Sequence, residues 1–437
     1  MMRETPRAHW PEGLTDLCRG SFDRGLFLVI CVPALLVALA AGGPLLGTAG
    51  TAAQERLVAV GDVHGDFDAL AAILRQAEVI DAQHRWIGRN VTFVQTGDYL
   101  GRGPKSRAVM DLLTALEEQA PRIGGRALTL LGNHEMMTLV GDLRYVVPAD
   151  YASFADDESE KRQEAAYQSY QEYCKRRAEA LNQPDPKFTP KTEERWKKAH
   201  PVGLVEHRQA FGPEGNYGRW LRGQPPVVEM NGTILLHGSI SPALAGSRVQ
   251  EMNKQIKNEI KAFDAYKQYF LEQKLILPFF NLEEMMAAVQ EEVKARKKAS
   301  RKPAAPTKEG DVSELSRQER QHLKIMEDFL SLGGWLSFHP EGPLWFRGFA
   351  QWSDQQGAQF LASLLPALGA KRFVVGHTVQ LDGRIRARFG GKVFLIDTGM
   401  LSSYFPGGQA SALEIRSDTI TAIYLNRRTV LQTNKNH

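Results

Sequence analysis

Residues 57–66 read LVAVGDVHGD, and this stretch sets the pattern from which the fold is predicted. Its first four residues are apolar and two of them are β-branched, which is typical of a buried strand. Gly61 ends the run and lets the backbone turn sharply. The side chains of Asp62 and His64 are therefore expected to project from the end of a rigid strand into a shared pocket.

The same unit recurs along the next seventy residues. A segment with helical spacing of apolar residues (66–80) is followed by VTFVQTGD (91–98), a helix expected from about 104 to 118, and ALTLLGNHE (127–135). Strands that alternate with helices predict an α/β body with a parallel core. In such a body, functional side chains are expected in loops at the carboxyl ends of the strands.

Strand-like runs return in the second half of the chain. We expect these last strands of the chain to form an antiparallel closing set. The runs are TILLHGS (233–239), RFVVGHT (372–378), KVFLIDTG (392–399), SALEIRS (411–417) and TAIYLN (421–426).

Two long polar stretches interrupt this pattern, at about 148–224 and about 249–332, and we interpret them as insertions into one body that spans 55–430. The second stretch is predicted to be mostly helical. It contains the basic run Lys294–Lys302, for which a solvated helix face is the favoured interpretation. The proline-containing segment 302–311 is expected to be a flexible loop.

The composition bounds the class of protein. The chain has 437 residues, of which 43% are hydrophobic and 24% charged. These are ordinary globular values, which exclude a disordered, collagen-like or polytopic membrane protein. The 54 basic and 50 acidic residues leave a net charge of only +4. A charge balance this even does not indicate a nucleic-acid partner.

The three cysteines restrict the metal chemistry. Cys18 and Cys31 fall in or beside the leader-like segment, so only Cys174 remains if that segment is removed. One thiol forms neither an internal disulfide nor a cysteine-based zinc site. Any metal must then be held by His, Asp, Glu and Asn.

The N-terminal segment, residues 1–54, indicates export. Leu26–Ala41 is an uncharged apolar run of about 16 residues that follows Arg19 and Arg24. Its length lies between a signal-peptide core and a membrane-spanning helix. Both a cleaved signal peptide and a retained single anchor fit. In either case the body is expected outside the cytosol, whether periplasmic, secreted or anchored to a membrane.

Five motifs sit at the ends of the apolar runs and supply two aspartates, one asparagine and three histidines, with a fourth histidine beside the asparagine. Such a set suits two divalent metals, Mn, Fe or Zn rather than Ca. One ion is expected on Asp62, His64 and a shared Asp98. The other is expected on Asp98, Asn133, His237 and His377. The motifs are Gly61–Gly65, Gly97–Asp98, Gly132–Glu135, His237–Gly238 and Gly376–Thr378.

These donors predict attack on a phosphoryl group. A water between two such ions is ionised near neutral pH, and the ions stabilise the growing charge. His134, which is not needed as a ligand, is predicted to protonate the leaving alkoxide. Arg102 in GDYLGRGP and Arg347 in GPLWFRG are candidates to bind phosphate oxygens, and Asn133 is a further substrate contact. Arg144 and Arg222 are weaker candidates.

The series D-x-H … GD … GNHE … H … GH resembles the calcineurin-like metallophosphoesterase superfamily, specifically its phosphoprotein phosphatase group. GDLRYV (141–146), FGPEGNYGRWLRGQPPV (211–227), GPLWFRG (342–348), VVGHTVQ (374–380) and IDTGM (396–400) resemble its Shewanella-like phosphatase branch. The resemblance implies a four-layer αββα sandwich with two mainly helical insertions, and phosphomonoester hydrolysis. It implies the same six metal ligands, His134 as acid and Arg102 on phosphate.

Two positions depart from the family pattern. The family's GDxxDRG is GDYLGRG here, so Gly101 replaces an aspartate that would orient His134. Loss of that carboxylate is expected to lower the pKa of His134, because a nearby anion favours imidazolium. Glu135 and Asp66 are candidates to replace it. In HGS, Ser239 stands where the family has a second glycine.

Three hypotheses follow. The first is a metal-dependent phosphatase acting on phosphoserine, phosphothreonine or phosphotyrosine in proteins, or on a small phosphate ester. The second, suggested by Gly101 and the RGP that follows, is an enzyme like the symmetrical dinucleoside tetraphosphate hydrolases. The third is a non-catalytic binding or scaffold protein of the same fold. The oligomeric state is left open.

Overall fold

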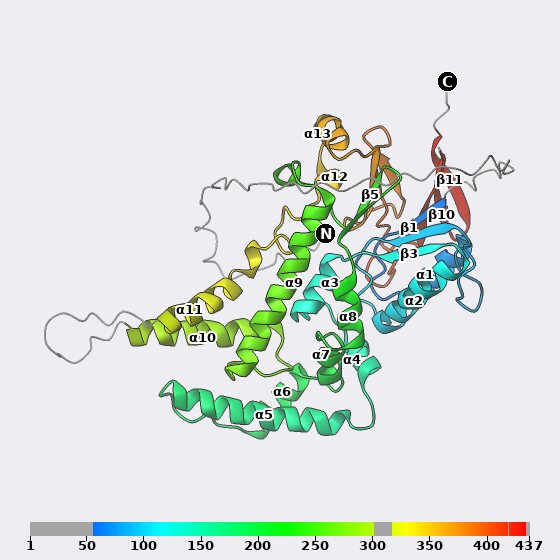
Figure 1. Cartoon of the computed structure of the whole chain (residues 1–437). Coiled ribbons are helices and arrows are strands. Elements are labelled where there is room, and N and C mark those ends of the chain that lie inside the picture. The colour runs from blue at the N-terminus through cyan, green and yellow to red at the C-terminus, as the bar shows by residue number, and fades with distance from the viewer. Residues whose placement is uncertain (1–55, 301–316, 418, 434–437) are drawn as a thin grey trace, which may run out of the picture. The chain divides into compact units, whose positions relative to one another are not determined.

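Two β-sheets form the centre of the body in this computed structural model, which describes residues 56–300, 317–417 and 419–433 (Figure 1). The larger sheet has six strands in the order β11-β10-β9-β1-β2-β3. Its first three strands in the chain pair in parallel and its last three pair antiparallel. Their bounds are β1 Arg56–Val60, β2 Val91–Gln95, β3 Arg126–Thr129, β9 Ser411–Arg416, β10 Thr419–Tyr424 and β11 Arg427–Thr433.

The smaller sheet has five strands in the order β4-β5-β6-β8-β7, and its three central strands are parallel. The expected antiparallel closing set is therefore right for β9 and β10 and wrong for β5, β6 and β8. An apolar run buried on both faces carries no mark of strand direction, so these runs look alike in the sequence. The bounds are β4 Val227–Met230, β5 Thr233–Leu236, β6 Arg372–Val375, β7 Arg386–Arg388 and β8 Val393–Leu395.

The two sheets pack face to face, with helices on the outer faces. Alternate residues of β1 show this: Ala59 joins an apolar cluster with Val374 of the other sheet, whereas Val58 and Val60 join the core beneath the helices. α1 (Phe67–Gln76) and α2 (Ser106–Gln119) cover the larger sheet, and α12 (Gly348–Gln351) and α13 (Asp354–Ala367) belong to the other side (Figure 1). The predicted four-layer αββα sandwich is confirmed.

The two insertions are helical, as predicted, and they pack against each other. Tyr173 Oη donates to the carbonyl of Leu275 at 3.0 Å, and Arg177 Nη1 donates to Glu292 at 2.6 Å. Their helices also contact α3 (Asn133–Val140), which begins at a predicted site residue. The helices are α4 Pro148–Phe154, α5 Ser159–Ala180, α6 Pro190–Ala199, α7 Leu204–Ala210, α8 Asn216–Gly223, α9 Val249–Glu272, α10 Leu282–Ser300 and α11 Arg317–Leu330.

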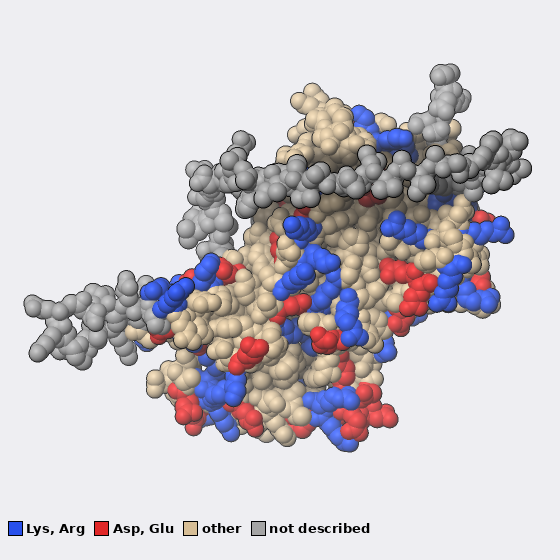
Figure 2. All heavy atoms as spheres, viewed as in Figure 1, with Lys and Arg blue, Asp and Glu red and all other residues tan. Residues whose placement is uncertain are grey.

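Charges on the body are mixed in sign. Figure 2 shows acidic and basic side chains interspersed over the face in view. The described part of the basic run lies at the end of α10, where Lys294, Lys297 and Lys298 are exposed, as a solvated helix face requires. The remainder of that run and the predicted loop 302–311 lie outside the described residues.

The predicted leader, including Leu26–Ala41, also lies outside the described residues. Among the residues that the structure describes, no helix is both long enough and apolar enough to cross a membrane.

Candidate metal centre

The predicted donors converge at the carboxyl ends of the central strands. Asp62 and His64 follow β1, Asp98 follows β2, His237 follows β5, and His377 follows β6. Asn133 opens α3 just beyond β3. Because these strands are parallel within each sheet, their ends meet at one edge of the sandwich. The structure thus brings all six predicted ligands together, and buries each of them.

The backbone strain lies on the functional residues as well as on the glycines. His64, Asp98, Arg102 and His377 all have positive φ, between 49° and 68°. Non-glycine residues held in this region cost about 1–3 kcal/mol each and cluster at functional sites. Gly61 acts through close approach instead, since a Cβ there would lie 2.6 Å from the carbonyl oxygen of Ile396.

The first group of donors surrounds the imidazole of His64. Its Nε2 lies 3.8 Å from Asp62 Oδ2 and 3.8 Å from Asp98 Oδ2. His134 Nε2 is also 3.8 Å from Asp98 Oδ2. Donor atoms of His64, Asp98 and His134 lie within 4.8 Å of one another, so His134 borders this group although it was predicted as an acid rather than a ligand.

The second group surrounds His237. Its Nε2 lies 2.9 Å from Asn133 Oδ1, 3.0 Å from His377 Nδ1 and 3.2 Å from Asp98 Oδ1. Asp98 therefore turns Oδ2 to one group and Oδ1 to the other, which is the arrangement expected of a shared ligand. Asp62 supports the second group from behind, since its Oδ1 accepts the backbone N–H of His377 at 2.9 Å.

Main-chain carbonyls set the tautomer of three histidines. A ring nitrogen that faces a carbonyl must carry the hydrogen, and this leaves the other nitrogen as a lone pair. In each case the lone pair is the one directed into the donor groups. The pairs are His64 Nδ1 with Leu100 O at 3.2 Å, His237 Nδ1 with Thr96 O at 3.1 Å, and His377 Nε2 with Trp345 O at 2.9 Å.

Converging lone pairs repel one another unless a cation lies between them. The facing nitrogens of His237 and His377, with the Asn133 oxygen, leave a donor set of nitrogen and oxygen atoms only. That set fits a divalent ion of borderline hardness. Among the residues that the structure describes no cysteine contributes, since Cys174 lies on α5. The residues therefore fit two divalent metals.

The electrostatics of the donors agree with this assignment except at His237, where Asp98 and Asp62 outweigh burial and raise the pKa. Burial would raise the pKa of Asp98, but His237 and His134 outweigh it and hold that pKa well below its usual range. Burial lowers the pKa of His64 and of His377 well below the usual value, so both rings stay neutral. Burial and the neighbouring Asp397 raise the pKa of Asp62, an effect that a bound cation would reverse.

His134 is held by an aromatic ring and not by the carboxylate that the resemblance implies. The ring of Tyr145 stacks on it at 4.8 Å with 15° between the planes. A Cβ at Gly101, where φ is +73°, would lie only 2.8 Å from His134 Nδ1. The pKa of His134 is lowered to about 4, the expected direction, but burial is the largest cause. Its Nε2 is buried with no hydrogen-bond partner among the described residues.

Neither residue proposed to replace the missing carboxylate contacts the His134 ring. Glu135 accepts the backbone N–H groups of Asp98, Tyr99, Leu100 and Gly132, which shapes the loop after β2. Asp66 caps α1 by accepting the N–H of Ala69 at 3.0 Å. Both expectations were wrong, because Glu135 is used in the loop after β2 and Asp66 in the cap of α1.

Arg102 lies at the mouth of the centre between two tyrosines. Its guanidinium carbon is 4.1 Å from the centre of the Tyr404 ring and 5.1 Å from that of Tyr145. The Tyr145 carbonyl also accepts the Arg102 backbone N–H at 2.7 Å. Both rings are partly exposed. Neither tyrosine was predicted as a site residue: Tyr145 was noted only as part of the motif GDLRYV, and Tyr404 was not noted at all.

Arg347 lies beside the centre and contacts its backbone. Its Nη1 donates to the carbonyl of His377 at 2.6 Å and to Thr378 Oγ1 at 3.1 Å. This contact supports the strained loop that presents His377. The weaker candidates are paired elsewhere, Arg222 with Asp264 and Arg144 with Asp142.

Asp397 was not predicted as a site residue. This buried carboxylate follows β8 in IDTGM, and burial raises its pKa to about 6. Its Oδ1 accepts the N–H of Gly399 at 3.0 Å. The rule that found the other residues, a polar side chain just after an apolar run, would have found it. The substituted Ser239 is buried, and its Oγ accepts the N–H of Phe349 at 3.4 Å.

Comparisons with known proteins agree with this geometry. A family model described as calcineurin-like phosphoesterase matches residues 55–252. An uncharacterized protein of Schizosaccharomyces pombe is 26% identical over 377 residues, which cover 84% of this chain and 80% of that protein. Shewanella-like protein phosphatase 2 of Arabidopsis thaliana is 42% identical over 100 residues, 23% of this chain and 26% of the relative.

A solved structure shows the same fold. The cold-active protein-tyrosine phosphatase of a psychrophilic Shewanella species covers 87% of this chain, and 81% of its own chain is covered, with a TM-score of 0.52 and 22% identity. The fold and the donor set define a metallophosphoesterase. Residues 55–252 match the calcineurin-like phosphoesterase family, and the chain is a metal-dependent phosphatase, a hydrolase of phosphoric esters. The predicted resemblance to the Shewanella-like branch is confirmed.

Proposed function

We propose that this phosphatase hydrolyses phosphomonoesters of proteins or small molecules at a centre of two divalent metals, Mn, Fe or Zn. The observation that carries the proposal is the convergence of carbonyl-fixed imidazole lone pairs on the shared Asp98. One ion is assigned to Asp62, His64 and Asp98. The second is assigned to Asp98, Asn133, His237 and His377.

Bound divalent ions would supply an ionised water as nucleophile and offset charge on the phosphoryl group. The chain supplies the rest. The guanidinium of Arg102 binds phosphate oxygens at the mouth of the centre, and Asn133 offers a further contact. His134 Nε2, which is buried beside Asp98, holds the proton for the leaving oxygen. Arg347 keeps the His377 loop in place.

The tyrosines favour an aromatic leaving group. Tyr145 and Tyr404 are 40% and 53% exposed and flank the phosphate-binding Arg102. Flat rings beside a phosphate site offer stacking surface to a planar group. Phosphotyrosine in a protein or peptide, or another aryl phosphate, is therefore the proposed substrate class. The similar Shewanella structure is of a protein-tyrosine phosphatase, which agrees with this choice.

The test is hydrolysis of p-nitrophenyl phosphate with added Mn²⁺. Asp98→Asn removes the shared ligand and costs several kcal/mol of transition-state stabilisation, so activity is expected to fall by about 10³-fold or more. Asp185→Asn, an exposed loop position, is the control and is expected to act as the parent. Activity that survives Asp98→Asn contradicts the proposal.

A substrate panel tests the finer assignment. Phosphotyrosine peptide is expected to give a higher kcat/KM than phosphoserine peptide. A preference for a symmetrical dinucleoside tetraphosphate would favour the nucleotide hydrolase suggested by Gly101 and RGP. Two bound metals without turnover on any ester would favour the scaffold hypothesis.

We further propose that the chain is exported, through the apolar run Leu26–Ala41. A charge in the middle of that run blocks insertion, so Leu35→Arg is expected to keep the protein in the cytosol. Leu46→Arg, beyond the run, is the matched control. Cell fractionation and activity assays measure both. Equal distribution of the two variants contradicts the proposal.

A further inference from the structure

A large cavity lies within the helical insertions, lined by residues of α2, α5, α7 and α9. Its volume is about 1000 Å³. Four cations, Arg107, Arg162, Arg208 and Lys267, line it together with aromatic rings such as Phe154 and Phe279. We call it the basic cavity. None of its lining residues is a predicted metal ligand.

Arg208 is the most buried of these cations. Only 4% of it is exposed, and burial lowers its pKa to about 10. Within the described part of the chain its guanidinium has no hydrogen bond and no ion pair, and its Nε is buried without a partner. The nearby Glu284, which acts to raise the pKa of Arg208, is bonded to His200 at 2.9 Å. Its guanidinium packs on Gly141, where a Cβ would lie 2.6 Å from Nη2. Gly141 ends α3, whose carbonyl end offers only about half a negative charge.

Lys267 adds a second uncompensated charge. It lies on α9 and lines the same cavity. Burial and the nearby Arg208 and Arg222 lower its pKa to about 7. No ion pair of Lys267 exists among the residues that the structure describes. The neighbouring Asp264 is already bonded to Arg222 at 2.7 Å, so it is not a full counter-charge for Lys267.

The cations at the rim are different. Arg162 pairs with Asp156 at 2.8 Å and with Glu206 at 2.5 Å. Arg107 donates to the hydroxyl of Tyr217 at 3.2 Å. Arg107 has no ion pair among the described residues, but it is exposed to solvent. Glu206, which also lines the cavity, is paired with Arg162. The buried charge without an ion pair is therefore that of Arg208 and Lys267.

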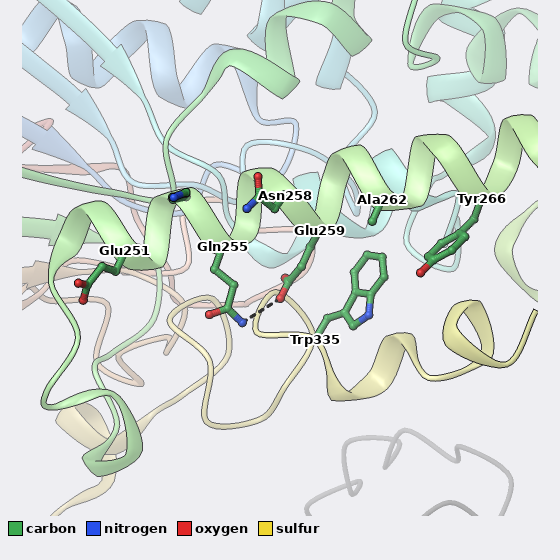
Figure 3. Close-up of a pocket in the computed structure, with 8 residues that line it drawn as sticks. Glu251, Gln255, Asn258, Glu259, Ala262, Tyr266 and Trp335 are labelled. Carbon is green, nitrogen blue, oxygen red and sulfur yellow. Dashed lines mark hydrogen bonds between the residues drawn. The ribbon is translucent and has the colours of Figure 1, made fainter. Parts of the chain in front are cut away.

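A second cavity shows the ordinary situation. Figure 3 shows Trp335 reaching toward α9 beside Glu259, in a cavity of about 480 Å³. There Glu259 accepts the N–H groups of Leu336 and Ser337, at 2.8 and 2.9 Å. The Glu259 carboxylate is therefore satisfied by hydrogen bonds within the fold, and this cavity gives no reason to propose a ligand.

Two like charges buried together without a counter-charge are costly, and natural sites pair such charges or bind an ion. An arginine fork matches the two oxygens of a phosphate or carboxylate, and a lysine adds a point charge. We propose that the basic cavity binds a small molecule through an oxyanion group, phosphate or carboxylate, held between Arg208 and Lys267. The volume leaves room for an apolar body against Phe154 and Phe279.

The test is calorimetric titration of the full chain, freed of metal so that phosphate has no ion to bind. Inorganic phosphate is the probe in one arm and benzoate in the other, which separates the two oxyanion sources. The parent is expected to bind one equivalent of at least one probe at this cavity. Arg208→Gln and Lys267→Gln are each expected to weaken that binding by about tenfold or more.

Lys261→Gln is the matched control, because it removes the same charge from an exposed position of α9. It is expected to bind as the parent does. Lys267 is only partly buried, so its variant carries the test if Arg208→Gln fails to fold. The proposal is overturned if the parent binds neither probe, or if the cavity variants bind as tightly as Lys261→Gln.

A purely structural role for Arg208 gives a different result. If the guanidinium only caps α3, Arg208→Gln lowers the melting temperature in anion-free buffer and leaves probe binding unchanged. If it serves an anion, the variant melts at or above the parent temperature without anion, because a buried unpaired charge is gone. The variant then loses the rise in melting temperature that the probe gives the parent.

Discussion

The metal centre and the basic cavity both bury several ionisable side chains, but they treat the charges differently. In the metal centre the imidazoles of the three proposed histidine ligands are each fixed by a main-chain carbonyl, and their free nitrogens lie close to the carboxylate of Asp98. In the basic cavity two cations line the same space, and neither has an ion pair among the described residues, because the nearby Glu284 and Asp264 are bonded to His200 and Arg222. The donors of the metal centre thus suit bound cations, whereas the unpaired cations of the basic cavity suit a bound anion.

The two sites also differ in what positions them. The donors of the metal centre stand at the ends of parallel strands, and strained backbone aims His64, Asp98 and His377. The basic cavity is assembled from helices of both insertions and from α2, held by packing. Rigid strand ends suit chemistry that depends on tenths of an ångström, whereas a cavity between helices suits binding.

The largest loss of activity that would sharpen this contrast is expected from a substitution of His134. His134→Asn removes the proton held for the leaving oxygen, so kcat is expected to fall by about 10²–10⁴-fold. Elemental analysis should still find the parent metal content. The loss should be smaller for p-nitrophenyl phosphate than for an alkyl phosphate, because nitrophenolate leaves without a proton. Loss of metal together with activity would instead make His134 a ligand.

An aspartate introduced at position 101 tests whether Tyr145 has taken over the role of the missing carboxylate beside His134. Gly101→Asp introduces a Cβ at φ +73° and 2.8 Å from His134 Nδ1. The displaced ring is expected to cost about 10²-fold in kcat, rather than to restore a family feature. Gly101→Ala has the same Cβ and no carboxylate, and should lose as much. Activity of the aspartate variant above the parent would show that the missing carboxylate limits the enzyme.

The residues at the strand ends could be predicted from the sequence because two signals coincide at each of them. An apolar run marks the strand, and the polar side chain after it marks the site, as in LVAVGDVH. This is why all six proposed ligands and His134 were found together. Asp397 carries the same two signals and was overlooked. The direction of β6 and β8 carries no such signal, because both runs are buried on both faces.

The basic cavity could not be found in this way. Arg107, Arg162, Arg208 and Lys267 lie on four different helices. Each sits in a polar, charged segment where a solvated helix face is the ordinary interpretation. Only the packing of the two insertions shows that two of these cations lack a partner. Tyr404 was missed for a similar reason, because its place over Arg102 depends on a loop returning from β8.

A smaller effect is expected from the ring that holds His134. Tyr145→Ala removes the stack on His134 and the contact with Arg102. Such aromatic contacts are worth about 0.5–1.5 kcal/mol, which corresponds to up to about tenfold in kcat/KM. Tyr145→Phe keeps the ring and should keep the activity. The pH profile of kcat should shift only in the alanine variant, and identical profiles would remove Tyr145 from the catalytic arrangement.

The smallest expected effect lies next to the basic cavity, at His207. Its ring packs among Tyr151, Phe154 and Phe211, and burial, followed by Arg208, lowers its pKa to about 3. An unfolded histidine titrates near 6.5. The neutral ring therefore contributes stability that is complete above about pH 6.5 and is lost as the pH falls toward 3. The loss is about 1.4 kcal/mol per pH unit.

His207→Phe and His207→Gln both remove this titration, so each should show a shallower fall in the free energy of unfolding between pH 7 and 5.5 than the parent. Urea unfolding at several pH values measures it, whatever the stability of each variant at pH 7. A fall that is as steep in both variants as in the parent would contradict the assignment of this titration to His207.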